Sequence, residues 1–145
     1  DMQAAVGCAQ LKKLPNFVES RRKNFDRLYE NLRDLQDKII LPEPCENSKP
    51  SWFGFLITCK EGVDRNKIVR HLESCGVQTR MLFAGNLLKH PCFDEMRKTG
   101  EGYRVVGDLS NTDRIMNDTF WIGIYPGMTA EKIDYMAEKI REALK

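Results

Sequence analysis

The stretch that decides the fold is residues 52–82, WFGFLITCKEGVDRNKIVRHLESCGVQTRML. Its first part, Trp52–Cys59, is rich in aromatic and β-branched side chains and predicts a largely buried strand. Asp64 is placed to cap a helix whose apolar residues recur on one side, and Gly76 suits the left-handed position that ends a helix. Residues 77–82 predict another strand. The segment is therefore expected to form a strand–helix–strand unit.

Helical and extended patterns flank this unit on both sides. A helical pattern covers residues 2–35, and Pro15 interrupts it. Because proline lacks a backbone donor and clashes with the preceding turn, we expect two helices or one sharply kinked helix. Residues 39–41 predict a short extended piece. Towards the C-terminus, residues 119–125 predict a further strand, and Thr129 is expected to cap a final helix.

This order of elements predicts an α/β fold of two layers, in which a small, mostly antiparallel sheet of three or four strands is backed by helices on one face. A long, mostly irregular segment covers residues 83–103, with a helical turn expected at 93–97 and a short helix at 111–116. Connections of this length inside a compact domain are usually functional or poorly ordered. The segment is therefore the first place to look for a site.

The chain of 145 residues has the length of one domain, residues 1–145. We expect residues 1–35 to form a kinked connecting helix and residues 36–145 to form the α/β layers. The helical pattern starts at Asp1 with no cap and no lead-in. We interpret this start as a cut, which would make the chain the C-terminal domain of a truncated enzyme.

Composition excludes several classes of function. The net charge is +2, and acidic and basic residues alternate throughout, whereas nucleic-acid binding needs a concentrated basic face. No apolar run approaches the length of a membrane span, and no signal-peptide pattern is present, so we expect a cytoplasmic protein that binds neither membrane nor nucleic acid. The five cysteines are odd in number and lack metal-ligand spacing, which predicts reduced, mostly buried thiols and no metal site.

Sequence signatures of catalysis are absent from the chain. It has no glycine-rich nucleotide loop, no serine-hydrolase elbow and no zinc-protease motif. His90 and Cys92 could form a nucleophilic pair, but no third group is placed to orient them, so structural roles are favoured. We therefore expect no catalytic residue in this chain.

Polar residues gather in the segment Thr79–Pro91, which leaves the end of a strand. In α/β folds such segments often carry ligand contacts. Arg80 could grip a phosphate or carboxylate with its planar guanidinium, and the turn at Gly85-Asn86 could expose an amide side chain. His90 lies in the same segment. From these residues alone, a polar surface loop is an equally good interpretation.

Several segments together resemble the C-terminal domain of the DegT/StrS-type sugar aminotransferases, which have the fold-type I architecture of pyridoxal phosphate enzymes. The similar segments span the chain in order: residues 1–32, PSWFGFLIT (50–58), the GVQTR strand (76–80) and FWIGIYPGMTAEKIDYMAEKI (120–140). Within the family, the PSWFGF, TRMLFAGNL and FWIGIYPG segments are similar to the RfbH-like branch of CDP-4-keto-6-deoxy-D-glucose-3-dehydrases. In ordinary sugar aminotransferases a histidine commonly stands in place of Phe53, so its aromatic ring favours the dehydrase branch, although a core strand would also use one.

The resemblance implies a parent enzyme that removes the C3 hydroxyl of a nucleotide sugar for 3,6-dideoxyhexose and lipopolysaccharide O-antigen biosynthesis. Its implied cofactors are pyridoxal or pyridoxamine phosphate and a [2Fe–2S] cluster, both anchored outside this chain. Its implied partners are the nucleotide sugar, an NADH-dependent flavin and iron–sulfur reductase, and a second copy in a homodimer. The catalytic base, the aspartate to the pyridine nitrogen and the cluster cysteines would all lie upstream.

The resemblance implies that this chain forms one wall of the parent enzyme's substrate cleft. Phe53 is expected against the cofactor or sugar, and Arg80 and Asn86 towards the nucleotide or phosphate, with His90 nearby. Two other readings stay open. The chain could be the corresponding domain of a nucleotide-sugar aminotransferase, or a free-standing binding module without chemistry.

Overall fold

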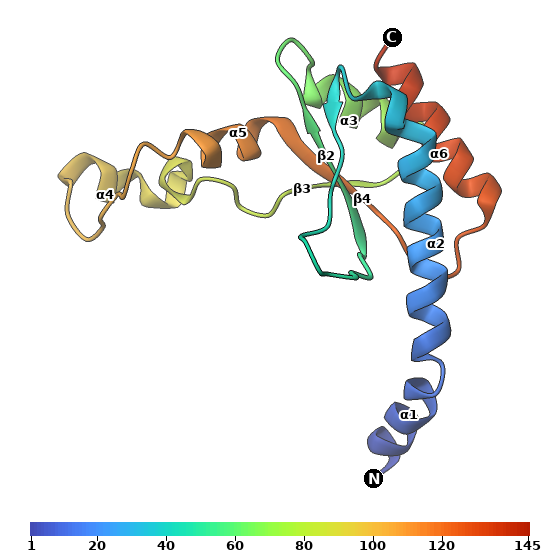
Figure 1. The fold of residues 1–145 in the computed structure, drawn as a ribbon. Helices are drawn as coiled ribbons and strands as arrows, with labels where there is room; N and C mark the ends of the chain where they lie inside the picture. The colour runs from blue at the N-terminus through green and yellow to red at the C-terminus, as the bar shows by residue number, and fades with distance from the viewer.

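A four-stranded antiparallel sheet with helices on one face forms the body of the molecule (Figure 1). The computed structural model describes residues 1–145. The elements in chain order are α1 (Met2–Leu11), α2 (Leu14–Leu32), β1 (Ile39–Ile40), β2 (Gly54–Cys59), α3 (Arg65–Ser74), β3 (Thr79–Met81), α4 (Asp94–Thr99), α5 (Ser110–Asp118), β4 (Thr119–Gly123) and α6 (Ala130–Ala143). Short 3₁₀ turns cover Arg33–Leu35, Leu87–Lys89 and Pro91–Phe93. The α/β sandwich expected from the sequence is confirmed, and every strand pair is antiparallel.

The strands lie in the order β1-β2-β4-β3, so the centre of the sheet is the pair β2 and β4. Their register places Phe55 opposite Ile122 and Leu56 opposite Trp121. Successive side chains of a strand point to opposite faces, so this register assigns each residue to one side of the sheet. Arg80 on the edge strand β3 pairs with Trp121 and therefore shares a face with it.

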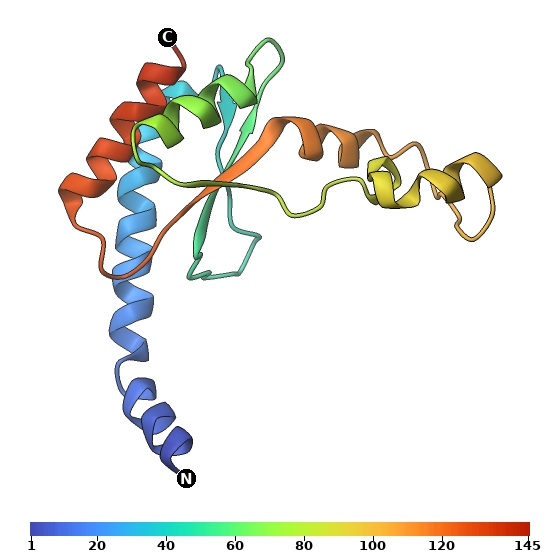
Figure 2. The same cartoon turned by 180° about the vertical axis from the view of Figure 1, so that it is seen from behind.

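One face of the sheet is buried under helices and the other is largely bare. Phe55, Ile57, Phe120 and Ile122 are at most 1% exposed and pack into one core with residues of α2, α3 and α6. Figure 2 shows these helices together on the same side of the sheet. The bare face carries Leu56, Arg80 and Trp121, together with Gly54 and Gly123; the arm described below covers it at one end.

Helices α2 and α6 are held together by polar contacts above the core. Arg27 on α2 makes a two-pronged ion pair with Asp134 on α6, at 2.8 and 2.6 Å, and Asn31 donates to the same carboxylate at 2.8 Å. The Arg27 guanidinium and the Asn31 amide hold the pKa of Asp134 below its usual range. A second pair joins Arg141 to Asp34. The C-terminal half of α2 thus belongs to the α/β core.

Helix ends follow the local chemistry of the sequence. The Asp64 side chain accepts hydrogen bonds from the backbone of Asn66 and Lys67, at 2.8 and 3.1 Å, and so caps α3. Gly76 takes a φ of +77° directly after that helix. Thr129 caps α6. The helix before Pro15 ends at Leu11 and a new one begins at Leu14, which confirms the expected break.

Residues 83–118, here called the arm, project from the body (Figures 1 and 2). The expected helical turn at 93–97 is α4, and the expected short helix at 111–116 is α5, which runs directly into β4. Helix α5 contacts β2 and β4, so the base of the arm covers one end of the otherwise bare face.

The expectation of mostly buried thiols is wrong. Cys8, Cys45 and Cys92 are exposed, Cys75 is half-buried, and only Cys59 is fully buried. Cys8 lies on α1, which has no buried residue. The apolar side chains of α1, among them Met2 and Val6, are exposed with Cys8. No helix is both long enough and apolar enough to cross a bilayer.

Two phenylalanines near the start of β2 test the division of the sheet into two faces. Phe55 is fully buried and its ring lies 4.9 Å from that of Phe25, whereas Phe53 is 62% exposed. Phe55→Ala should lower the free energy of unfolding by about 3–5 kcal/mol because it leaves a cavity in the core. Phe53→Ala should cost much less. Urea unfolding followed by circular dichroism checks this, and equal losses in the two variants would contradict the assignment of faces.

Candidate substrate-facing site

The bare face of the sheet carries an aromatic and cationic platform, which we define as Phe53, Leu56, Arg80 and Trp121. The rings of Phe53 and Trp121 meet edge to face, with their centroids 5.4 Å apart. Trp121 lies opposite Leu56 on β2 and opposite Arg80 on β3. Two of the predicted site residues, Phe53 and Arg80, are thus brought to either side of one indole.

A glycine makes room for this indole. A Cβ atom at Gly54 would lie 2.8 Å from Cε3 of Trp121, closer than carbon atoms normally approach. The absence of a side chain at Gly54 therefore allows the Trp121 ring to lie across β2 beside Phe53. Close packing of Trp121 against the backbone therefore accounts for the glycine in PSWFGF.

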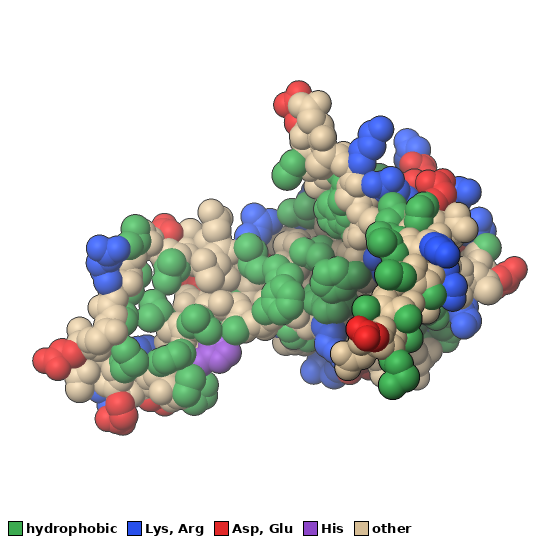
Figure 3. Space-filling model, turned by 90° about the horizontal axis from the view of Figure 1, so that it is seen from below, with side chains coloured by type: hydrophobic (Ala, Val, Ile, Leu, Met, Phe, Trp, Pro, Cys, Tyr) green, Lys and Arg blue, Asp and Glu red, His purple; other side chains and the backbone are tan.

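Two hollows open on either side of Trp121. The smaller, of about 170 Å³, is almost wholly apolar and is lined by Phe53, Leu56 and Phe83 among others. The larger is a groove of about 760 Å³, lined by Arg80 and residues of the β4–α6 connection and α6. Figure 3 shows hydrophobic side chains gathered between the body and the arm. An apolar surface with a few convergent polar groups is typical of ligand sites.

Arg80 has donors available for an anion. It is exposed, and its Nη1 donates to the carbonyl of Thr79 at 2.8 Å, while the remaining guanidinium N–H groups have no partner within the chain. A guanidinium has five donors, so one internal bond leaves most of its capacity unused. This geometry fits the expected contact with phosphate or carboxylate.

The expectation that Asn86 exposes its amide is wrong. Asn86 is 5% exposed; its Nδ2 donates to Asp113 on α5 at 2.7 Å, and its Oδ1 accepts from the backbone of Leu88 at 3.0 Å. Lys89 forms an ion pair with the same Asp113 at 2.8 Å. The side chains of Asn86 and Lys89 thus latch the two halves of the arm together. A ligand contact by Asn86 stays a prediction.

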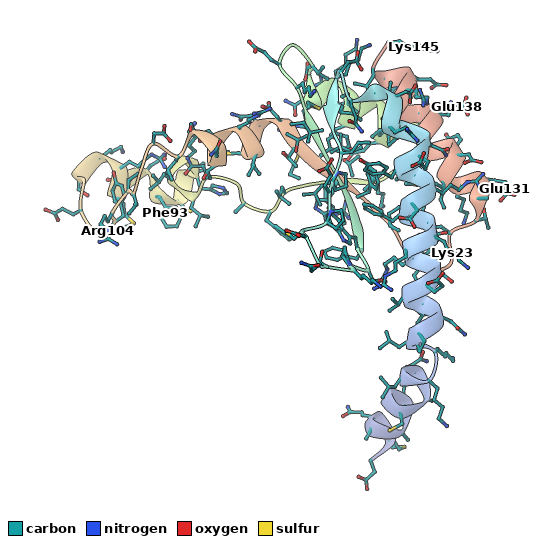
Figure 4. The ribbon with its side chains drawn as sticks, viewed as in Figure 1. Lys23, Phe93, Arg104, Glu131, Glu138 and Lys145 are labelled. Carbon is teal, nitrogen blue, oxygen red and sulfur yellow. The ribbon has the colours of Figure 1, made fainter.

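His90 lies on the arm, away from the platform. Its Nε2–H donates to the carbonyl of Ala84 at 2.5 Å, and its own carbonyl accepts from Arg97 at 2.9 Å. Figure 4 shows Phe93 and Arg104 towards the outer part of the arm, well separated from Glu131 on α6. His90 and Asn86 are therefore near each other in the arm, whereas Phe53 and Arg80 lie on the sheet.

Residues that sequence reasoning missed are Trp121, Phe83 and Asp113. The signal for Trp121 was available, because strict alternation in the strand 119–125 places it on the face opposite Phe120 and Ile122. Phe83 takes a φ of +51° and is 79% exposed, a strained conformation for a bulky residue that only the structure reveals. Asp113 has no local sequence signal, since its partners precede it by more than twenty residues.

Metal-ligating side chains are not clustered into a metal site in the structure. No group of three or more His, Cys, Asp or Glu side chains is arranged to hold a metal ion. Burial raises the pKa of the Cys59 thiol to about 11, so this cysteine stays protonated and is a poor metal ligand. For pyridoxal phosphate, the platform offers the exposed Phe53 ring and the Arg80 guanidinium. These residues fit contact with one side of such a group.

The comparisons with known proteins agree with this architecture. The family model described as the DegT/DnrJ/EryC1/StrS aminotransferase family matches residues 1–141. The chain belongs to this family. The domain seen here is the C-terminal region of fold-type I pyridoxal phosphate enzymes, as the resemblance implied.

Individual relatives point to one branch of the family. The chain is 52% identical to the lipopolysaccharide biosynthesis protein RfbH of Salmonella typhimurium, over 98% of this chain and 32% of that protein. It is 43% identical to the dTDP-4-dehydro-2,6-dideoxy-D-glucose 3-dehydratase of Saccharopolyspora spinosa, over 98% of this chain and 30% of that protein. A crystal structure of GDP-4-keto-6-deoxymannose-3-dehydratase with a trapped PLP-glutamate geminal diamine superposes with a TM-score of 0.79 at 30% identity, covering 96% of this chain and 35% of the other. The chain spans about a third of the length of the relatives it matches.

The latch in the arm predicts an unusual titration of Asp113. Hydrogen bonds from Lys89 and Asn86 hold the pKa of Asp113 below its ordinary value of 3.8. Because the pKa of this carboxyl group is lower in the folded arm than in the unfolded chain, its ionised form stabilises the arm at pH values above the unfolded-state pKa. This stabilisation is lost as the pH falls through the folded-state pKa. Carbon-detected NMR of the carboxyl group should show a midpoint below 3.8.

Two lysines of the arm provide the comparison. Lys89→Ala should move the Asp113 midpoint up towards 3.8, because the largest cause of the shift is removed. Lys98→Ala should leave it unchanged, because Lys98 pairs with Glu95 elsewhere on the arm. A midpoint at or above 3.8 in the unaltered chain would show that the latch does not form in solution.

Proposed function

We propose that this chain forms one wall of the substrate cleft in a larger cytoplasmic, pyridoxal phosphate-dependent enzyme. The enzyme would remove the C3 hydroxyl of CDP-4-keto-6-deoxyglucose in 3,6-dideoxyhexose and lipopolysaccharide O-antigen biosynthesis. The observation that carries the proposal is similarity along nearly the whole chain to proteins named RfbH and sugar 3-dehydratase. The aromatic ring of Phe53, which is exposed on the bare face, also supports the proposal.

The cofactors would be held by the part of the protein outside this chain. Pyridoxamine phosphate, when bound, supplies an amine that condenses with the C4 ketone of the sugar. The base, the aspartate to the pyridine nitrogen and the cysteines of a [2Fe–2S] cluster would belong to the same outside part. Since the cysteines of this chain form no ligand set, we assign none of them to the cluster.

The platform would orient the substrate. Phe53 and Trp121 present ring edges and faces against which a sugar or a planar cofactor can pack, and Arg80 offers free guanidinium donors to a phosphate. Contacts remote from the reacting carbon align it and supply binding energy without taking part in bond making. In this proposal the chain positions the substrate and excludes water from it.

The partners follow from the same proposal. Electrons for the deoxygenation would come from an NADH-dependent flavin and iron–sulfur reductase, and two copies of the enzyme would form a homodimer. The bare face and the arm leave apolar side chains uncovered, among them Phe83, 79% exposed, and Val106, 73% exposed. Such surface is expected to be covered by the rest of the protein or by a second copy.

Product analysis tests the reaction. The full-length protein that carries this chain, given CDP-4-keto-6-deoxyglucose, NADH and a reductase, should release a 3-deoxy sugar, identified by mass spectrometry and NMR. It should also show the absorption of the cofactor and the cluster, and the 145-residue chain alone should show neither. An amino sugar formed at the expense of glutamate would instead establish a nucleotide-sugar aminotransferase.

Arg80→Ala tests the role of the platform in that enzyme. Loss of a charge-assisted contact to phosphate should raise KM by about tenfold, with a smaller change in kcat, because the contact is made in both ground and transition states. Arg70→Ala is the matched control, since Arg70 is exposed on α3 and lies away from the platform. An unchanged KM in Arg80→Ala would remove Arg80 from the substrate site.

A further inference from the structure

A cysteine, a histidine and a glutamate meet where α3 packs on α6. His71 lies in the last turn of α3 and Cys75 directly follows the helix, a spacing that puts both side chains on one face. The Cys75 sulfur lies 3.8 Å from Nε2 of His71, and Glu142 on α6 brings Oε2 to 3.3 Å from the same nitrogen. One ring nitrogen thus faces both a thiol and a carboxylate, and the three side chains are not arranged to hold a metal ion.

Neighbouring residues fix this cluster in place. The backbone N–H of Cys75 donates to the carbonyl of His71 at 3.1 Å, and its carbonyl accepts from the Tyr135 hydroxyl at 2.9 Å. Lys139 forms an ion pair with Glu142 at 2.7 Å. Lys139 and, to a smaller extent, His71 hold the pKa of Glu142 below its usual range. An ionised carboxylate therefore lies beside the imidazole.

Solvent reaches the cluster. The side chains of His71 and Glu142 are 35% and 36% exposed, and Cys75 is half-buried. The other four cysteines lack this combination, because three are exposed without a histidine contact and one is buried: Cys8, Cys45, Cys92 and Cys59 respectively. Cys75 is thus the one cysteine that combines access with a neighbouring imidazole. Reactive cysteines are typically found in such surroundings.

We propose that Cys75 is a site of reversible thiol–disulfide exchange with low-molecular-weight disulfides, in which His71 accepts the thiol proton and Glu142 positions the imidazole. In the tautomer that carries its proton on Nδ1, Nε2 of His71 takes the proton from the thiol, and the new N–H donates to Glu142. The Cys75 thiolate then attacks one sulfur of the disulfide. The old S–S bond breaks with its electron pair on the other sulfur, which leaves as a thiolate, and a mixed disulfide remains on Cys75.

The site adjoins the larger groove. Gly76, which follows Cys75 in the chain, and Tyr135, which binds the Cys75 carbonyl, both line that groove. A mixed disulfide at Cys75 would therefore place a substituent beside the groove, and a free thiol would remove it by the reverse exchange. The inference requires neither the cofactors nor the reaction proposed above, so it stands or fails separately from them.

Exchange with glutathione disulfide tests the site in the full-length protein that carries this chain. Adduct formation at each cysteine is followed in time by acid quenching, digestion and peptide mass spectrometry. Cys75 should react faster than Cys45 and Cys92, although both of these residues are more exposed. His71→Asn should slow exchange at Cys75 by about tenfold or more, because the proton acceptor is lost, and leave Cys45 and Cys92 unchanged.

The buried Cys59 reports on folding in the same experiment, since it should stay unmodified as long as the core is intact. An unmodified Cys75 in the unaltered protein would overturn the proposal. The same rate at Cys75 with and without His71→Asn would also overturn it.

Glu142→Gln has a matched control in Glu138→Gln. The two glutamates are one turn apart on α6 and both contact Lys139, but only Glu142 reaches His71. Glu142→Gln should slow exchange at Cys75 and shift the ring-nitrogen NMR signals of His71, because the imidazole loses its carboxylate partner. Glu138→Gln should change neither. Equal exchange rates and equal His71 signals in the two variants would overturn the role assigned to Glu142 and with it the proposed cluster.

Discussion

The alternation of side chains along β2 and β4 is the constraint on which the rest of the structure depends. Phe55, Ile57, Phe120 and Ile122 all point to one side and require a cover, which α2, α3 and α6 provide. A strand cannot bury one face without presenting the other, so the same alternation sends Trp121 and its neighbours to the bare side. A slip of one residue between β2 and β4 would exchange the two sets, which is why the register is strongly specified.

The arm is stabilised in a different way from the sheet. Its residues have little apolar core of their own, and polar contacts hold it together: Asn86 and Lys89 both bind Asp113, and Arg97 binds two carbonyls of the opposite turn. At Gly85 a Cβ atom would lie 2.6 Å from Met116, so α5 packs directly on the turn backbone. The arm is therefore anchored at its base, by α5 on the sheet and by this turn, while its outer part relies on hydrogen bonds that water can replace.

Sequence reasoning succeeded where the cause is local. The caps at Asp64 and Thr129, the helix break before Pro15 and the strand expected within 119–125 all depend on a few consecutive residues, and all are found, the strand as Thr119–Gly123. It failed where the cause is distant. Asn86 carries the same signals whether it faces solvent or Asp113, and the exposure of Cys8 depends on what covers α1. Phe53 and Arg80 were chosen as separate candidates, and only the structure shows that both lie beside Trp121: Arg80 pairs with it across the strands, and the Phe53 ring meets the indole edge to face.

In the proposed function, a bare sheet face of this kind orients a substrate whose chemistry is carried out by groups outside the chain. Leu56, Arg80 and Trp121 of the platform stand on paired strands, and Gly54 lets the indole lie close to the backbone. Rigid walls fix where a substrate's ring lies relative to chemistry supplied from the opposite side, and small displacements of the reacting atoms cost large factors in rate. An aromatic ring at Phe53 offers packing surface, whereas a histidine would offer a hydrogen-bonding nitrogen. In the proposed cleft, the residue at this single position therefore decides whether the wall offers the ligand a packing contact or a hydrogen bond, without any change in the fold.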